Sequence, residues 1–262
     1  MSYKDGQTGY PQTPLASRAV IKKSLYALIP QEGLVKNQIP GFENCDISIL
    51  ASPKLGASFV DYIATVNPGG YNKSGFGGMG IESFVYVISG RVLAGDGHSK
   101  YDLPRGGFLY LPPDRQLYLQ NQTGEAAEIF LYKRRYRPLD GHWPSPVQGD
   151  VNHLPGLDYE GMKDVQLWNL LPAGDPAYDL NFHILSFKTG ASHGYVETHV
   201  QEHGAIILEG EGMYNLDNQW LPVRRGDYIF MGAYVPQAAY GIGRQETFSY
   251  LYSKDCNRDE II

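Results

Sequence analysis

An internal repeat is the feature that most constrains the fold of this chain. The second half matches the first at an offset of 120 residues, and three pairs of segments carry the match: ESFVYVISG (82–90) with EHGAIILEG (202–210), LPRGGFLYLPP (103–113) with PVRRGDYIFMG (222–232), and IFLYKRR (129–135) with SYLYSKD (249–255). The repeated unit is too long for a solenoid repeat, so the sequence indicates duplication of a whole domain.

Each unit consists of short apolar runs, such as FVYVI and AIILEG, separated by Gly, Pro, Asn or Asp. This pattern is typical of strands and turns, and neither unit contains an amphipathic helical pattern. The 31 Gly, 17 Pro and 20 Tyr residues agree with many short strands. We therefore predict an all-β chain of two sandwiches or barrels, in which closed or double-sheet arrangements protect the strand edges.

We expect four parts along the chain. Residues 1–45 precede the repeat and are expected to form an arm that packs on a domain or on another subunit. The N-terminal domain is expected at 46–140 and the C-terminal domain at 151–262. A linker at 141–150 lies in a segment rich in Pro and Gly.

Composition and charge narrow the classes of partner. The formal net charge is −6, and the 22 Lys and Arg residues are scattered along the chain. We therefore expect neither nucleic acid nor a membrane as a partner. The one basic cluster, 133–135, ends a strand-like run and is interpreted as a solvated strand end.

The sequence also predicts the compartment. The N-terminus has no continuous apolar core of a signal peptide, and no stretch approaches the ~18 apolar residues of a membrane span. We therefore expect a cytoplasmic protein. Cys45 and Cys256 fit no metal or redox motif, so we expect reduced thiols, with a disulfide as the alternative.

The segment GYVETHVQEHG (194–204) holds the candidate site. If VETHV is a strand, Glu197 and His199 point to the same face. His203 could return to the same point after a turn. Burying a carboxylate and two imidazoles unpaired is costly, and a divalent metal would remove that cost. The alternative is a surface hairpin with three solvated polar residues, and the spacing alone leaves both readings open.

These residues lie in a pattern that resembles the cupin signature, H-x-H-x3-E-x6-G followed by G-x5-P-x-G-x2-H. The spacings match while the ligand types are permuted: Glu197-x-His199-x3-His203-x6-Gly210, then Gly226-x5-Gly232-x-Tyr234-x2-Gln237. The resemblance implies a bicupin, that is, two tandem double-stranded β-helix (jelly-roll) barrels.

The whole chain resembles the (S)-ureidoglycine aminohydrolases, bicupins of purine-ring catabolism. The resemblance includes GFENCD (41–46), KLGASFVDY (54–62), SHGYVETHVQEHGA (192–205), YNLDNQW (214–220), GDYIFMGAY (226–234) and YSKDCNRD (252–259). It implies an enzyme that converts (S)-ureidoglycine and water to (S)-ureidoglycolate and ammonia. It also implies a homo-oligomer, since duplicated cupins commonly pair further.

The same resemblance implies the roles of the site residues. Mn²⁺ would be held by Glu197, His199, His203 and Gln237, and substrate would contact Glu197, Gln237, Tyr250 and Lys254. Lys254 and Glu197 are the implied catalytic groups. Carboxylate and amide oxygens suit Mn²⁺, although two imidazoles also suit Fe²⁺, Co²⁺, Ni²⁺ or Zn²⁺.

The repeat provides an internal control. At the 120-residue offset the four candidate ligands fall on Gly77, Met79, Ser83 and Leu117, none of which is a good ligand. We therefore expect one metal per chain, in the C-terminal domain. Lys254 falls on Arg134, so a strand-end charge common to both units is the alternative to a substrate role.

Other polar residues receive structural interpretations. His193 lies in an expected turn, and Glu202 aligns with Glu82 of the metal-free unit. Tyr214 is expected in the core or in the pocket lining. The remaining histidines fit no ligand spacing: His98, His142, His153 and His183.

Two other functions stay open at this point. One is a cupin with different chemistry, such as a dioxygenase or an isomerase, which oxygen consumption would reveal. The other is a non-catalytic bicupin that binds or stores a small molecule.

Overall fold

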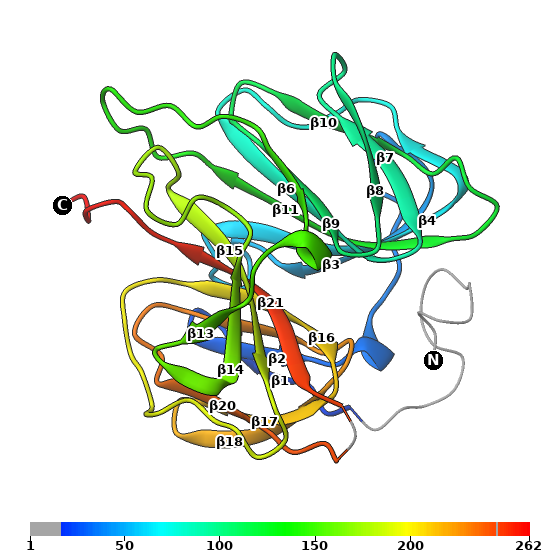
Figure 1. Ribbon diagram of the computed structural model, residues 1–262. Coiled ribbons are helices and arrows are strands. Elements are labelled where there is room, and N and C mark those ends of the chain that lie inside the picture. The colour runs from blue at the N-terminus through cyan, green and yellow to red at the C-terminus, as the bar shows by residue number, and fades with distance from the viewer. Residues whose placement is uncertain (1–16, 245) are drawn as a thin grey trace.

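The structure is a computed structural model that describes residues 17–244 and 246–262. The described chain is built from β-strands with two short 3-10 turns, η1 (Gln31–Gly33) and η2 (Val151–His153). Figure 1 shows two β domains stacked on each other. The all-β fold with two tandem barrels, predicted from the repeat, is confirmed.

The N-terminal domain contains a ten-stranded sheet in which neighbouring strands are antiparallel. Its strands are β3 (Phe42–Ala51), β4 (Phe59–Asn72), β5 (Phe76–Gly77), β6 (Ile81–Ser89), β7 (Arg91–Gly95), β8 (Lys100–Pro104), β9 (Gly107–Leu111), β10 (Gln116–Gln120), β11 (Ala127–Arg135) and β12 (Val147–Asp150).

The C-terminal domain contains an eight-stranded and a three-stranded sheet. The larger sheet has the order β1-β2-β19-β16-β21-β15-β14-β13 and the smaller the order β18-β17-β20. The strands are β1 (Val20–Lys22), β2 (Tyr26–Ile29), β13 (Leu157–Tyr159), β14 (Met162–Asn169), β15 (Leu180–Phe187), β16 (His203–Glu209), β17 (Glu211–Leu216), β18 (Gln219–Arg224), β19 (Tyr228–Met231), β20 (Gln237–Gly241) and β21 (Phe248–Asp255).

The expected arm is divided between the two domains. Its strands β1 and β2 extend the C-terminal sheet, with β2 paired to β19 (Figure 1). Strand β3 crosses the expected boundary between residues 45 and 46 and pairs with β4. The expected linker contains β12, which pairs with β9. Residues 1–16 of the arm lie outside the described residues.

Strand alternation separates three apolar clusters. In β11, Ile129 and Leu131 face the interior of the N-terminal domain, while Phe130 and Tyr132 face the C-terminal domain. In β15, Phe182 faces the N-terminal domain and stacks on Phe84, with ring centroids 3.7 Å apart. Because each central strand has one face in a barrel and one in the domain interface, both faces are apolar.

Two smaller observations complete the fold. Cys45 and Cys256 are both free, as the sequence predicts. No helix in the described chain is long and apolar enough to cross a membrane.

Candidate metal centre

Three of the four predicted ligand side chains meet at one end of the C-terminal barrel. The Nε2 atom of His199 lies 3.2 Å from Nε2 of His203 and 2.8 Å from Nε2 of Gln237. His203 begins β16 and Gln237 begins β20. Both residues are buried, whereas His199 is partly exposed. The two imidazole rings are nearly perpendicular, with an interplanar angle of 88°.

The prediction of a strand over VETHV (196–200) is wrong. Glu197 forms only an isolated bridge, and His199 is in no strand. The segment is held by a turn instead, because the N–H of Tyr234 donates to the carbonyl of His199 and the hydroxyl of Thr198 donates to the carbonyl of Tyr234. The histidine is therefore placed by the turn at 232–235 and not by a continuous ladder.

The isolated bridge joins Glu197 to Gln237. Each residue donates its backbone N–H to the carbonyl of the other, at 2.9 Å in both directions. Directly opposed residues of an antiparallel pair project their side chains to the same face, with Cα atoms about 5.5 Å apart. The bridge thus puts the carboxylate and the amide side by side at the barrel end.

The protonation of His203 is set by its neighbour on β21. Nδ1 lies 2.8 Å from the carbonyl oxygen of Ser253, which can only accept, so Nδ1 carries the proton. Burial holds the pKa of His203 well below its ordinary value, so the ring is neutral. Its Nε2 therefore presents a lone pair toward His199, which is the state that a metal-ligating histidine requires.

The Glu197 carboxylate lies apart from the imidazoles of His199 and His203. Its Oε1 lies 4.0 Å from Nε2 of His193. Across the described residues, no three His, Cys, Asp or Glu side chains are close enough to hold a metal ion. His193 accepts the N–H of Ala239 on Nδ1, and burial lowers its pKa to about 4, so its proton is on Nε2 and faces the carboxylate.

The donor set suits a divalent metal. His203 offers a lone pair on Nε2, His199 presents its own Nε2 to the same point, and Gln237 can present its amide oxygen by rotation. Glu197 is adjacent through the bridge. A cation among these atoms would receive nitrogen and oxygen donors and no thiolate, so the residues present fit a hard or borderline ion.

Lys254 and Tyr250 lie on the same face of β21. Tyr250 is buried in the C-terminal core, where its ring packs against that of Tyr214 with centroids 5.6 Å apart. Lys254 is partly exposed, and its charge is close enough to lower the pKa of Glu197, opposing the larger effect of burial. It also adds to the effect of burial in lowering the pKa of His199. The ammonium therefore lies beside the ligand group, with the tyrosine deeper in the barrel.

Comparisons with known proteins agree with this arrangement. No family model matches the chain. It is 57% identical over 259 residues to the (S)-ureidoglycine aminohydrolase of Escherichia coli (strain K12), covering 99% of both chains. It is 33% identical over 249 residues to the (S)-ureidoglycine aminohydrolase of Arabidopsis thaliana, covering 95% of this chain and 81% of the relative.

The chain belongs to the (S)-ureidoglycine aminohydrolase family.

Solved structures show the same fold. The crystal structure of the Escherichia coli protein Ylba matches this aminohydrolase-family chain with a TM-score of 0.86 and 54% identity, over 95% of this chain and 98% of that one. An oxalate decarboxylase from Lactobacillus farciminis matches with a TM-score of 0.67 and 13% identity, over 94% and 88%, which shows the fold alone. The predicted bicupin architecture is confirmed.

The match of Lys254 to Arg134 is wrong by one residue. In the N-terminal domain Lys133 of β11 is opposite Ser83 of β6. In the C-terminal domain Tyr252 of β21 is opposite Ala205 of β16, which puts Lys254 opposite His203, the counterpart of Ser83. Lys254 therefore corresponds to Lys133. The ungapped 120-residue offset therefore fails on this last strand, where it wrongly matches Leu131 with Leu251 and Tyr132 with Tyr252.

Arg134 serves the domain interface instead. Its Nη2 lies 3.4 Å from the carboxylate of Asp255, and its Nη1 lies 3.4 Å from the carbonyl of Asp179. The side chain is 4% exposed. Arg134 and Lys254 therefore face different sides of their strands, and the cation that the two units share at this position is Lys133 in the N-terminal domain and Lys254 in the C-terminal domain.

The N-terminal barrel fills the equivalent space with apolar side chains. Phe76 is opposite Leu117 there, as Glu197 is opposite Gln237 in the C-terminal domain. The counterpart of Glu197 is thus Phe76 and not Gly77. Phe76 and Leu117 are buried in the N-terminal core, and Nζ of Lys133 lies 5.2 Å from the Phe76 ring centroid.

Sequence spacing missed two residues of the site, Tyr252 and His183. The Tyr252 ring packs between His183, at 5.2 Å, and His203, at 5.4 Å between centroids. Tyr252 could have been found, because it lies between Tyr250 and Lys254 on the same face of one predicted strand. His183 is brought there by the pairing of β15 with β21, for which the sequence holds no local signal.

Glu202 has the structural role expected of it. Its Oε2 accepts the backbone N–H of Ser58 at 2.9 Å and so links the two domains. Tyr214 is buried in the C-terminal core, 3% exposed.

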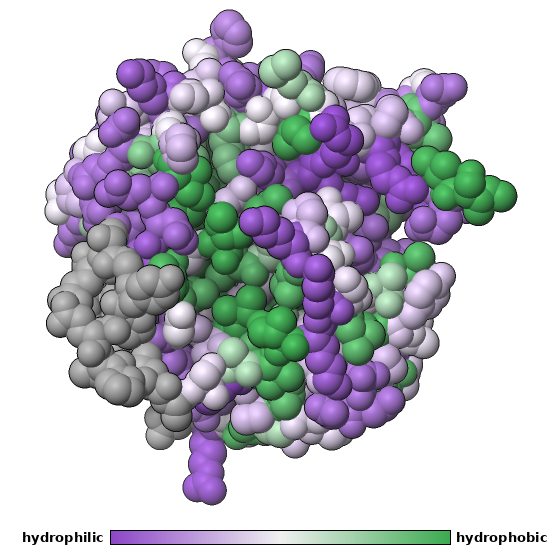
Figure 2. Space-filling view, turned by 180° about the vertical axis from the view of Figure 1, so that it is seen from behind, coloured by the Kyte–Doolittle hydropathy of each residue, from purple (hydrophilic) through white to green (hydrophobic). Residues whose placement is uncertain are grey.

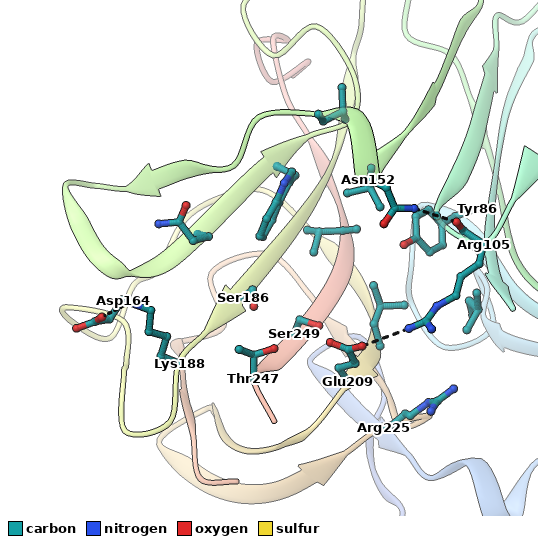
Figure 3. A pocket seen from close by; sticks show the side chains of 18 residues that line it. Tyr86, Arg105, Asn152, Asp164, Ser186, Lys188, Glu209, Arg225, Thr247 and Ser249 are labelled. Carbon is teal, nitrogen blue, oxygen red and sulfur yellow. Dashed lines mark hydrogen bonds and ion pairs between the residues drawn. The ribbon is translucent and has the colours of Figure 1, made fainter. Parts of the chain in front are cut away.

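A separate cavity of about 720 Å³ lies between the domains and contains none of the predicted site residues (Figure 3). Arg105 and Glu209 approach each other across it, at 3.2 Å, and Lys188 pairs with Asp164 at 2.8 Å. Arg105 and Lys188 are thus each paired with a carboxylate, and this arrangement provides no catalytic constellation.

Proposed function

We propose that the protein is a manganese-dependent hydrolase that converts (S)-ureidoglycine and water to (S)-ureidoglycolate and ammonia in purine (allantoin) degradation. The observation that carries the proposal is the convergence of His203 and Gln237 on Nε2 of His199, with Lys254 beside them, in a chain 57% identical to an (S)-ureidoglycine aminohydrolase.

Glu197, His199, His203 and Gln237 would hold one Mn²⁺ per chain in the C-terminal domain. When bound, the ion supplies a Lewis acid that anchors and orients the substrate. Rotation of the Glu197 side chain would bring its carboxylate toward the other three, and the backbone bonds between Glu197 and Gln237 support this. The carboxylate and amide oxygens favour manganese over softer ions.

The chain's own groups bind the rest of the substrate. The Lys254 ammonium pairs with the substrate carboxylate or holds a proton for the departing amine. Tyr250 donates a hydrogen bond toward the ureido or carboxylate end, and Glu197 and Gln237 contact the reacting carbon's substituents. The amine leaves as ammonia once it is protonated, because the ureido nitrogen donates its electron pair and releases its N–H proton to form an acylimine. Water then adds to one face of that carbon.

We propose further that the enzyme is a cytoplasmic homo-oligomer whose partner is the small-molecule substrate, with no nucleic acid or membrane partner. Apolar side chains gather toward the middle of the face seen in Figure 2. Apolar surface gathered in this way is typical of protein interfaces, which supports self-association.

The test is ammonia release from freshly generated ureidoglycine by metal-stripped protein, with and without added Mn²⁺. The expected result is Mn²⁺-dependent release with only (S)-ureidoglycolate as product. Racemic product at the uncatalysed rate from a folded, metal-loaded protein contradicts the proposal. Oxygen consumption instead of ammonia release would identify a dioxygenase.

A further inference from the structure

His183 on β15 presents an unpaired hydrogen-bond acceptor inside the C-terminal barrel. Its Nδ1 lies 2.8 Å from Oδ1 of Asn169, an amide oxygen that only accepts, so Nδ1 carries the proton. The side chain is buried, with 7% of the residue exposed. Burial and then the charge of Lys254 lower its pKa to about 4, so Nε2 keeps its lone pair at neutral pH.

The Nε2 atom faces accessible space. It has no hydrogen-bond partner among residues 17–244 and 246–262, and it is not one of the polar atoms that are both inaccessible and unpaired there. Tyr252 packs against one side of the ring. Beyond Tyr252 lies His203 of the predicted metal centre.

The position of His183 relative to Lys254 follows from the strand register. His183 is directly opposite Tyr252, and Lys254 is two residues further along β21 on the same face. Such diagonal neighbours have Cα atoms about 7–8 Å apart. The barrel wall therefore offers a cation and a neutral acceptor at a separation that suits a small ligand with a carboxylate at one end and an N–H donor at the other.

We propose that His183 is a further specificity-determining residue, whose Nε2 accepts a hydrogen bond from the terminal ureido N–H of the substrate while Lys254 holds the carboxylate. This inference rests on the proposed function and adds to it a subsite for the ureido group. A carboxylate at position 183 would form an ion pair with Lys254. A neutral imidazole instead accepts the hydrogen bond from the ureido N–H and leaves the ammonium free for the substrate carboxylate.

The subsite predicts discrimination among ligands. A small hydroxy acid without a ureido group leaves Nε2 of His183 unpaired and desolvated, and a site built to hydrogen-bond rejects such a ligand. The affinity for the ureido ligand is therefore expected to exceed that for the hydroxy acid by about ten-fold for each good hydrogen bond to a buried acceptor.

The experiment compares the binding of (S)-ureidoglycolate and glycolate to the Mn²⁺-loaded full chain by calorimetry. The wild type is expected to prefer ureidoglycolate. His183→Leu should lose about ten-fold of this preference, and His183→Gln, which retains an acceptor near the Nε2 position, should keep most of it. Lys254→Met is the matched control, because it should weaken both ligands alike.

A second measurement uses only the wild type, so it does not depend on how a variant folds. A ureidoglycolate with two methyl groups on its terminal nitrogen has no N–H there, and it should bind about ten-fold more weakly than the parent. An unchanged preference in a folded, metal-loaded His183→Leu protein, or equal binding of the methylated ligand, overturns the inference. Absence of ammonia release by the wild type would instead overturn the proposed function.

Discussion

His203 donates its Nδ1 proton to the carbonyl oxygen of Ser253 at 2.8 Å, and this bond decides which nitrogen faces the metal centre. The acceptor is a backbone atom of β21, the strand that also carries Tyr250 and Lys254. The orientation of a ligand and the placement of the substrate-binding residues therefore depend on the same strand pairing. A shift of β21 by one residue would change both together.

We expect His203→Ala to lower the affinity for Mn²⁺, because it removes the one imidazole whose lone pair is already fixed. The affinity should fall by at least about ten-fold, because replacing even a residue that only hydrogen-bonds to a metal ligand typically costs that much. Metal content after dialysis and calorimetric titration measure the change. His153→Ala is the control, since the His153 side chain is 83% exposed. Equal metal content in the two variants would contradict the assignment.

Metal removal should lower the melting temperature of the wild type. An ion that binds the folded chain at 100 times its dissociation constant stabilises it by about 2.7 kcal/mol. Thermal unfolding with and without Mn²⁺, after chelation, measures this shift. The His203→Ala protein should show little shift. A shift of the same size in that variant would place the bound ion elsewhere.

Lys254→Met and Lys133→Met form a matched pair, because the two lysines occupy equivalent positions in the two barrels. Lys254→Met should abolish most turnover with little change in stability. Lys133 lies over the rings of Tyr62 and Phe76, so its replacement should cost about 0.5–1 kcal/mol of stability and leave turnover intact. Ammonia release and denaturant unfolding separate the two effects, and loss of turnover in Lys133→Met would refute the division of roles.

A buried carboxyl at the domain interface should make stability depend on pH. Asp61 accepts the hydroxyl of Tyr228, and burial raises the pKa of Asp61 from 3.8 to about 8. Between these values the folded state holds a proton that the unfolded state has released, so stability falls as pH rises from about 4 to about 8. The slope from this one group reaches about 1.4 kcal/mol per pH unit.

Asp61→Asn removes this titration. Its unfolding free energy should vary less with pH across that window than that of the wild type, and the difference should be largest above pH 8. Denaturant unfolding at a series of pH values tests this. Parallel curves for the two proteins would show that Asp61 does not carry the dependence.

The local parts of the site could be predicted from the sequence. Glu197, His199 and His203 are close along the chain, and the spacing of the cupin signature indicated where Gln237 would return to them. Each of these positions follows from spacing on one or two adjacent segments. The resemblance to the aminohydrolases also named Tyr250 and Lys254, which share one strand face.

The remaining parts depend on contacts between strands that are distant in sequence. Strand β2 of the N-terminal segment pairs with β19, about two hundred residues later, and His183 reaches the site only through the pairing of β15 with β21. The ungapped repeat misassigned Lys254 because a one-residue difference between the domains leaves the apolar pattern intact while reversing which face each side chain occupies.

By itself the sequence determined that this chain is a duplicated all-β protein with one candidate metal centre. Duplication and strand periodicity both appear as patterns among residues that are close along the chain. Only the tertiary structure decided which side chains surround that centre, which nitrogen of His203 faces it, and that Lys133 is the true counterpart of Lys254. Strand register is set by packing across the whole barrel, and no stretch of neighbouring residues encodes it alone.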